Sequence, residues 1–370
     1  MSSQVHRGAV ADGAGEGSVR SRRSSESSRA ERRALEGSAA AAPAPPRSRD
    51  TLRQFERPDA ARALWQVATS FVPYVATMAL MYLMMRQGLP WWTTLPLAVL
   101  AAGFMVRLFI LMHDCIHSSF LRSRRAERFL GRILGVLVFT PFGEWGQSHL
   151  GHHATSGDLD RRGIGDVWTL TVREYAAASG AKRFQYRVTR NPFLMLLFGP
   201  FLVFLIGNRI PPRRATRQRV MSVVYTDLGI AAIVVTAALT VGLEAYLLIQ
   251  LPVLFFGGAW GIWLFYVQHQ FEGSYWSRHG EWNPLQAALQ GSSYYKLPKV
   301  LQWFSGSIGL HHVHHLRPRI PSYNLQRCLD ATPDLWIPPL TLSGSLKCAR
   351  LALWDERARE FVSFRAASCG

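Results

Sequence analysis

Residues 92–117 read WTTLPLAVLAAGFMVRLFILMHDCIH, an apolar run over 92–112 that leads directly into His113 and His117. A helix of about 20 apolar residues crosses the roughly 30 Å hydrocarbon core of a bilayer, so this run predicts a membrane-spanning helix. Histidines four positions apart share one face of a helix. The sequence therefore predicts a pair of neighbouring imidazoles where a membrane span ends.

Three other segments are long and apolar enough to cross a membrane, at 67–86, 223–241 and 245–266. The short turns QGLPW and GLE join the four spans into two hairpins. The runs 129–142 and 192–207 are also apolar, but each is short or interrupted by Pro and Gly, so we expect interfacial or half-inserted helices there. The expected fold class is an all-α membrane protein with four transmembrane helices in two hairpins.

The apolar membrane domain is expected to occupy residues 63–340, and 341–370 to form a C-terminal segment. Residues 1–62 are poor in large apolar side chains and rich in Arg, Ser and Ala. Such a composition buries too little apolar surface to offset the entropy of ordering, which predicts a disordered tail.

The positions of the basic residues indicate the orientation in the membrane. Of 42 Lys and Arg, only Arg86 and Arg107 lie within 67–112, and none lies within 223–266. Basic loops favour the cytoplasmic side, so we expect a multi-pass membrane protein with both termini in the cytoplasm. The net charge of +18 is then a membrane-surface signal, and no nucleic-acid partner is expected because no binding module accompanies it.

The four cysteines are widely spaced and form no CxxC pair. On this topology all four lie on the reducing side of the membrane, so free thiols are expected. They are Cys115, Cys328, Cys348 and Cys369.

Two further histidine clusters, QSHLGHH at 147–153 and HHVHH at 311–315, lie in the long segments that follow the second and fourth spans. Each HxxHH offers three imidazoles from about one helical turn, and imidazole suits iron, zinc, copper and nickel. Eight nitrogens exceed the needs of one ion, so two ions are expected. Iron is our expectation because it activates O₂, although the spacing also admits zinc. The eight are His113, His117, His149, His152, His153, His311, His314 and His315.

His269 lies just beyond the fourth span, at the matching depth, and is expected to be a ninth ligand. His312 would point off the HxxHH face and is expected to support the ligands, whereas His6 and His279 are expected to have no metal role. Carboxylates that orient the second ring nitrogens are also expected. The candidates, which the sequence does not rank, are Asp114, Asp158, Asp160, Asp166, Glu144 and Glu272.

The pattern HDCIH, HLGHH and HHVHH, split by a membrane hairpin, resembles the integral-membrane fatty acid desaturases of the histidine-box di-iron family. The stretches HHATSGDLDRRGIGDVWTLTVREY, FYVQHQFEGSYW and SIGLHHVHHLRPRIPSYNL are similar to bacterial acyl-lipid desaturases, including the delta-12 and delta-5 branch. The likeness runs from about residue 60 to about 335. Ile116 departs from the pattern, because many relatives have Gly there.

The resemblance implies a protein of the bacterial inner membrane with a cytoplasmic helical cap that holds two iron ions through the eight box histidines, with His269 as the extra histidine. It implies an enzyme that uses O₂ to place a cis double bond in a membrane-lipid acyl chain held in an apolar tunnel. Electrons would come from a ferredoxin-like or other external carrier, because the scattered cysteines cannot form an iron–sulfur site. A basic patch would meet this carrier or lipid phosphates, and comprises Arg122, Arg124, Arg125, Arg161 and Arg162.

Two alternatives remain open. A lipid or carotenoid hydroxylase or ketolase of the same superfamily would share every ligand and differ in adding oxygen to the product. A metal transporter would need ionisable side chains near mid-membrane. The spans are nearly free of such side chains, with Asp227 near one end of the third span, and the histidines lie outside the hydrocarbon, which disfavours transport.

Overall fold

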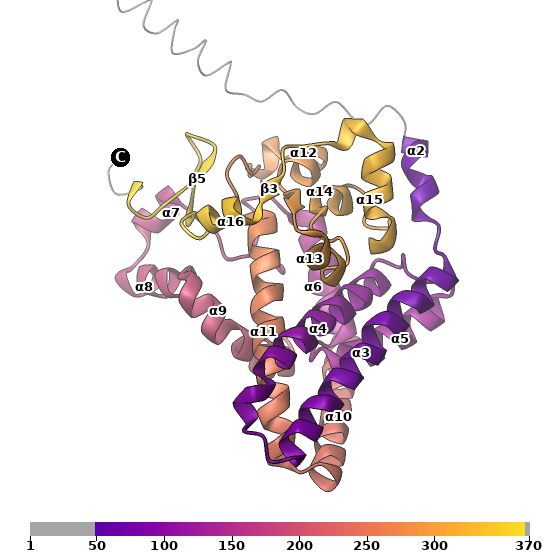
Figure 1. Ribbon diagram of the computed structural model, residues 1–370. Coiled ribbons are helices and arrows are strands. Elements are labelled where there is room, and N and C mark those ends of the chain that lie inside the picture. Colours follow the sequence, from indigo (N-terminus) through magenta and orange to yellow (C-terminus); the bar gives the residue numbers. More distant parts are fainter. Residues whose placement is uncertain (1–48, 367–370) are drawn as a thin grey trace, which may run out of the picture. The chain divides into compact units, whose positions relative to one another are not determined.

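The computed structural model describes residues 49–366, and the expected tail over 1–48, with His6 and Cys369, lies outside the described residues. Within this described part of the chain, five helices are long and apolar enough to cross a membrane. Four of them contain the four expected spans: α3 (Ala60–Arg86), α4 (Leu95–Ile116, preceded by the 3₁₀ turn η2, Trp91–Thr94), α10 (Arg217–Thr240) and α11 (Leu243–His269). Figure 1 shows these helices extending away from the shorter ones.

The fifth candidate span was expected to be interfacial. Pro192–Arg209 is one helical run made of α9 (Pro192–Phe201), the π-helical turn η3 (Leu202–Ile206) and the 3₁₀ turn η4 (Gly207–Arg209). Pro200 has no backbone N–H to donate, so one helical hydrogen bond is missing there. The wider π-helical turn follows directly, and the chain stays helical. By length and composition alone, the structure therefore has one more candidate span than the sequence analysis counted.

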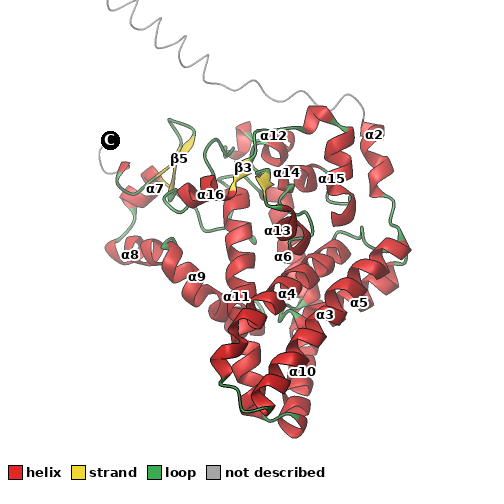
Figure 2. Cartoon of the chain, viewed as in Figure 1, coloured by secondary structure: helices red, strands yellow, loops and turns green. Residues whose placement is uncertain are grey.

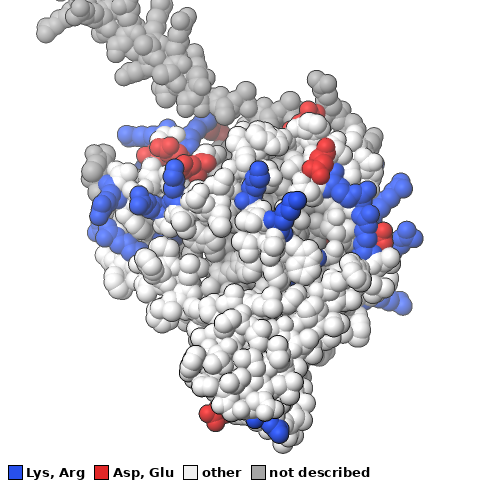
Figure 3. Space-filling model, viewed as in Figure 1, with Lys and Arg blue, Asp and Glu red and all other residues white. Residues whose placement is uncertain are grey.

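The candidate spans carry exposed apolar side chains, as helices facing lipid do. Phe193 and Leu239 are each 82% exposed. Figure 3 shows few charged side chains on the lower part of this face and most of its Lys and Arg on the upper part. Large apolar exposure next to a charged surface is typical of a membrane contact.

Short helices surround the ends of α4 and α11 that carry histidines. The first of them are α5 (Arg124–Leu137), α6 (Phe142–Thr155), α7 (Val172–Ala177) and α8 (Gly180–Thr189). After α11 come η5 (His279–Glu281), α12 (Pro284–Leu289), α13 (Lys299–Phe304), α14 (His311–Leu316), α15 (Ser322–Ala331), η6 (Pro333–Leu335) and α16 (Leu342–Cys348).

Contacts from α10 hold the start of α6, the helix that carries the second histidine box. Ser222 of α10 accepts hydrogen bonds at Oγ from the backbone N–H groups of Gly143 and Glu144, and so caps α6 from a neighbouring helix. Arg219 of α10 forms a two-bond ion pair with Glu144, at 2.5 and 2.6 Å. The first turn of α6, which carries the second histidine box, is therefore held by α10.

The expected boundary of the tail at residue 62 is wrong. The chain is helical from α2 (Arg49–Arg53) and the 3₁₀ turn η1 (Gln54–Glu56) onward. Leu52 and Phe55 are buried in an apolar cluster with Leu310 and Val313 of the third box region, and Asn324 donates to the Phe55 carbonyl. Two apolar side chains are enough to hold this short segment in place, because the apolar cluster around Leu310 and Val313 buries both of them.

The expectation of an all-α fold needs a small correction, because short strands occur among the described residues (Figure 2). The strands β1 (Leu170–Thr171), β4 (Leu353–Asp355) and β5 (Glu360–Val362) form one sheet in the order β1-β4-β5, and β2 (Tyr295–Lys296) pairs with β3 (Leu340–Thr341). β1 pairs with β4 and β2 with β3 in parallel, while β4 and β5 are antiparallel.

These strands bind the C-terminal segment to the rest of the fold. The fully buried Tyr186 adds to this link, since its hydroxyl donates to the Ala352 carbonyl at 2.5 Å and accepts from the Leu170 N–H at 3.0 Å. Residues 341–366 therefore belong to the same compact unit as the helices. Cys115, Cys328 and Cys348 are buried free thiols, as expected.

Candidate metal centre

The three boxes and His269 come together although they are far apart in the chain. The end of α4 presents the first box, α6 the second, α14 the third, and His269 is the last residue of α11. Their ligand atoms form two groups, each within 4.8 Å, that could hold a metal ion. One group is His113, His117, His149, His153 and His314, and the other is His152, His269, His311 and His315.

Each HxxHH box is divided between the two groups. In the second box the pair separated by four residues, His149 and His153, joins the first group, and His152 joins the second. The third box has the opposite arrangement, because His311 and His315 join the second group and His314 joins the first. An HxxHH helix thus reaches two points at once: residues i and i+4 share one direction, and residue i+3 is turned to the side.

Adjacent Nε2 atoms lie at one repeated separation. In the first group the successive Nε2–Nε2 distances are 2.9, 3.1, 3.1 and 3.1 Å along His117, His149, His153, His314 and His113. In the second group they are 3.0, 3.0 and 3.1 Å along His152, His269, His311 and His315. The rings therefore point their Nε2 atoms at two shared points.

This spacing fits a cation at each point. Two imidazole nitrogens that bind one ion at right angles, each at about 2.1 Å, lie about 3.0 Å apart. Hydrogen bonds alone satisfy the arrangement poorly, because a neutral imidazole has one N–H and Nδ1 of His113, His153 and His311 has no hydrogen-bond partner among the described residues. The nitrogen-only donor set suits a transition metal better than magnesium or calcium.

Burial keeps these rings in the form that binds metals. Removal from water lowers the pKa of His149, His153 and His311 well below its usual value, and the neighbouring histidines lower it further. The same holds for His314 and His315. A neutral imidazole with a free lone pair is the ligand form, so the site is prepared for a cation at neutral pH.

Two carboxylates lie next to the Nδ1 atoms of box histidines, on the side of the ring opposite the Nε2 atom. Asp166 lies 2.5 Å from Nδ1 of His152, a distance at which the ring N–H donates to the carboxylate, and its other oxygen accepts from the Gly163 N–H. Asp114 lies 3.5 Å from Nδ1 of His113 and also accepts at 2.8 Å from the N–H of Ser322, the first residue of α15. Of the expected carboxylates, these two contact box histidines.

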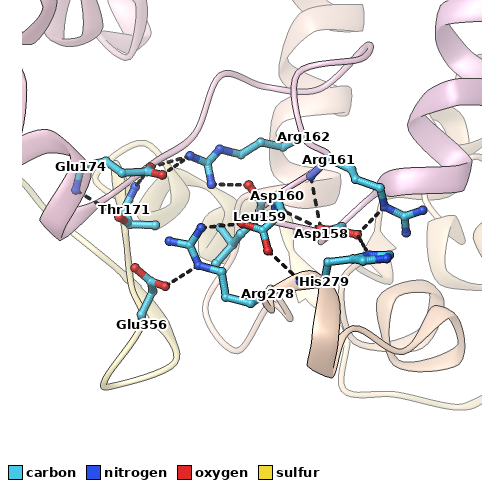
Figure 4. A network of polar contacts seen from close by, with 10 residues as sticks. All are labelled: Asp158, Leu159, Asp160, Arg161, Arg162, Thr171, Glu174, Arg278, His279 and Glu356. Carbon is cyan, nitrogen blue, oxygen red and sulfur yellow. Dashed lines mark hydrogen bonds and ion pairs between the residues drawn. The ribbon is translucent and has the colours of Figure 1, made fainter.

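The other residues that were expected to support the metal ligands have different partners or are exposed. Asp158 pairs with Arg161 and His279, and Asp160 pairs with Arg278, in the network of Figure 4 that reaches Glu356 near the C-terminus. His312 points away from both groups, since its Nε2 bonds the Leu335 carbonyl at 3.0 Å. Glu272 is exposed, and Glu144 pairs with Arg219.

Sequence reasoning missed two contacts of the site. The indole of Trp145 stacks on His149, with ring centroids 4.6 Å apart and an interplanar angle of 11°. The spacing of four residues between them on one helix was a usable signal. The Gly291 carbonyl lies 3.2 Å from Nδ1 of His269, and no sequence pattern marks a backbone carbonyl.

An apolar cavity of about 420 Å³ reaches the histidines from the candidate spans. His113, His149 and His311 line its inner end, and most of the remaining wall is formed by apolar residues of α4, α9, η3 and α11, with Ser148, Asp166 and Gln268 as polar lining residues. Gly261 of α11 also lines it, and a Cβ added there would meet no atom within 4 Å. The site therefore combines a nitrogen-rich centre with an apolar compartment of a size typical of ligand pockets.

Comparison with known proteins agrees with this geometry. The model of the fatty acid desaturase family matches residues 90–336. The chain is 45% identical over 313 residues to a fatty acid desaturase of Bacillus subtilis, covering 84% of this chain and 88% of that protein. It is also 25% identical over 256 residues to the sn-1 oleoyl-lipid 12-desaturase of Synechocystis, covering 68% of this chain and 71% of that protein. The chain belongs to the integral-membrane fatty acid desaturase family.

Proposed function

We propose that the protein is an O₂-dependent acyl-lipid desaturase that introduces a cis double bond into a membrane-lipid acyl chain. The observation that carries the proposal is that the apolar cavity meets both imidazole groups. His113 and His149 of the first group and His311 of the second group line it. Family membership supports an oxidoreductase, and the oleoyl-lipid substrate in the name of the Synechocystis relative supports a lipid-bound acyl chain.

Two iron ions are the proposed occupants of the histidine groups. When bound, iron supplies the O₂-dependent oxidation of an unactivated methylene, which no side-chain acid, base or nucleophile can perform. The first group would hold one ion through His113, His117, His149, His153 and His314. The second group would hold the other through His152, His269, His311 and His315.

The chain itself orients the ligands and excludes water. Asp166 holds the Nδ1 proton of His152, which leaves the Nε2 lone pair directed at the metal position. The apolar walls of the cavity would hold the acyl chain with two adjacent methylenes next to the inner end, where His113, His149 and His311 lie. The depth of that compartment would decide which carbons are placed there.

We propose the four-span topology with a cytoplasmic cap and both termini in the cytoplasm. Basic residues flank Pro192–Arg209 on both sides, with Arg187 and Arg190 before it and Arg213 and Arg214 after it. Basic flanks favour the cytoplasmic side, which supports an interfacial or half-inserted helix over one that crosses. The histidine ends of α4 and α11 then lie on that same side.

Electrons would come from an external carrier. Cys115, Cys328 and Cys348 are separate buried thiols, and among the described residues no cysteine group suits an iron–sulfur cluster. A ferredoxin-like or other acidic carrier would meet a basic surface that includes Arg122, Arg124 and Arg125, all exposed.

The direct test of the reaction is expression in a host without polyunsaturated lipids, followed by mass analysis of the fatty acids. We expect a product lighter by two hydrogens, and we expect His152→Ala to abolish it by removing a ligand whose Nδ1 is already fixed. His279→Ala is the matched control, because this histidine pairs with Asp158 outside both groups and should leave the product in place. A product heavier by one oxygen would contradict desaturation and indicate a hydroxylase.

Asp166 should control how tightly the second group binds its ion. Removing a carboxylate that orients a metal-bound histidine typically costs about 10–100-fold in metal affinity or activity, and we expect this for Asp166→Asn. Equilibrium competition with a coloured iron chelator measures the affinity. Glu272→Gln, at an exposed carboxylate, is the control and should bind as the wild type does. Equal affinity of both variants would show that Asp166 does not orient His152.

Gly261 should limit the length of acyl chain that the cavity accepts. Gly261→Leu places a side chain in the open space beside α11, so we expect a shift of the product distribution toward shorter acyl chains, measured by gas chromatography of total lipids. Gly180→Leu is the matched control, because this exposed glycine also has no atom within 4 Å of an added Cβ and lies outside the cavity. An unchanged distribution in Gly261→Leu would place the acyl chain elsewhere.

A further inference from the structure

The nine clustered histidines are not equally covered. Seven are buried, whereas His153 and His315 are half-buried. His153 belongs to the first group and His315 to the second. Their rings stack, with centroids 4.0 Å apart and an interplanar angle of 19°. One ring from each group therefore faces the same side of the centre.

That side is a second cavity, of about 230 Å³. It shares no lining residue with the apolar cavity, which touches His113, His149 and His311. Every residue that lines it lies outside the five candidate spans, and the lining includes the exposed Pro284. The lining residues are His153, Ser156, Trp282, Pro284, Leu285, Ala287, Ala288, His315 and Leu316. The centre is thus reached from the membrane side and, separately, from the opposite side.

The apolar cavity and the second cavity differ in how easily a hydrated divalent cation could pass through them. A divalent cation in water carries tightly held water ligands, and losing them in an apolar compartment is costly unless other ligands replace them. The apolar cavity offers few replacements, because most of its wall is apolar and its polar side chains Ser148, Asp166 and Gln268 each lie next to a clustered histidine, in sequence or by contact. The second cavity leads directly to two imidazoles, and Ser156 adds a polar wall. An ion entering there exchanges water for nitrogen one ligand at a time.

We propose that this second cavity is the aqueous port through which divalent metal ions enter and leave both histidine groups. The inference rests on the proposed metal centre. His153 is the first ligand that an ion meets on its way to the first group, where its Nε2 lies 3.1 Å from those of His149 and His314. His315 has the same role in the second group, with its Nε2 3.1 Å from that of His311. Each displaced water returns to the cavity, and no change of oxidation state is involved.

Trp282 and Leu285 set the width of the port. The indole N–H of Trp282 donates to the Ser156 carbonyl at 3.0 Å, and Arg161 lies over the ring at 5.0 Å from its centroid, so the indole forms a fixed wall. Leu285, on α12, is half-buried and lines the same cavity. Leu285→Trp should therefore narrow the port, and Trp282→Ala should widen it.

The test measures the rate of iron loss from the purified full-length chain in lipid nanodiscs. Protein loaded anaerobically with Fe²⁺ is mixed with excess ferrozine, a charged chelator whose iron complex is followed by absorbance. We expect iron release to be several-fold slower in Leu285→Trp and several-fold faster in Trp282→Ala. The amount of iron bound at the start should equal that of the wild type, because neither side chain is a ligand. Since the two changes are independent, one well-folded variant is sufficient for the test.

Matched controls repeat each substitution away from the port. Leu346→Trp and Trp336→Ala alter exposed residues outside the cavity and should release iron at the wild-type rate. Gly261→Leu narrows the apolar cavity and should also leave the release rate unchanged. Slower release in Gly261→Leu, with wild-type rates in both port variants, would overturn the proposal. A chain that follows the expected rates but forms no double bond would contradict the proposed function and leave the port in place.

Discussion

Nine imidazoles, seven buried and two half-buried, direct their Nε2 atoms at two points, and the rest of the structure depends on this constraint. A buried polar group without a partner is costly, and here several ring nitrogens crowd together while others have no hydrogen-bond partner within residues 49–366. Such an arrangement is stable when a cation satisfies the nitrogens together, and metal binding then contributes to the stability of the fold. The proposed iron ions are therefore structural as well as catalytic.

The scaffold holds this arrangement by placing each box on a helix whose end is fixed by a different part of the chain. Ser222 and Arg219 of α10 hold the first turn of α6, and Asp114 joins the end of α4 to the start of α15. The Gly291 carbonyl contacts His269 at the end of α11. Because these contacts are distant in sequence, the site forms only when the whole fold does. The apolar cavity between α4, α9 and α11 then opens onto imidazoles that are already in position.

The spans and the boxes could be predicted from the sequence because their signals are local. Hydropathy over about 20 residues identifies a span, and HxxHH spacing identifies three imidazoles within about one turn. The division of each HxxHH between two groups could not be predicted, since it depends on the angles at which α6 and α14 meet. The burial of Leu52 and Phe55 could not be predicted either. Both lie in an Arg-rich segment, and their packing partners lie far away in the sequence, near residue 310. The short strands of the C-terminal segment likewise depend on pairing with distant residues.

The central claim is that these histidines bind a pair of iron ions, and iron quantification combined with X-ray absorption at the iron edge tests it most directly. The account predicts two irons per chain and a coordination shell dominated by imidazole nitrogen, as groups of five and four histidines require. A chain that binds a single iron, or iron surrounded mainly by sulfur or carboxylate oxygen, would contradict it.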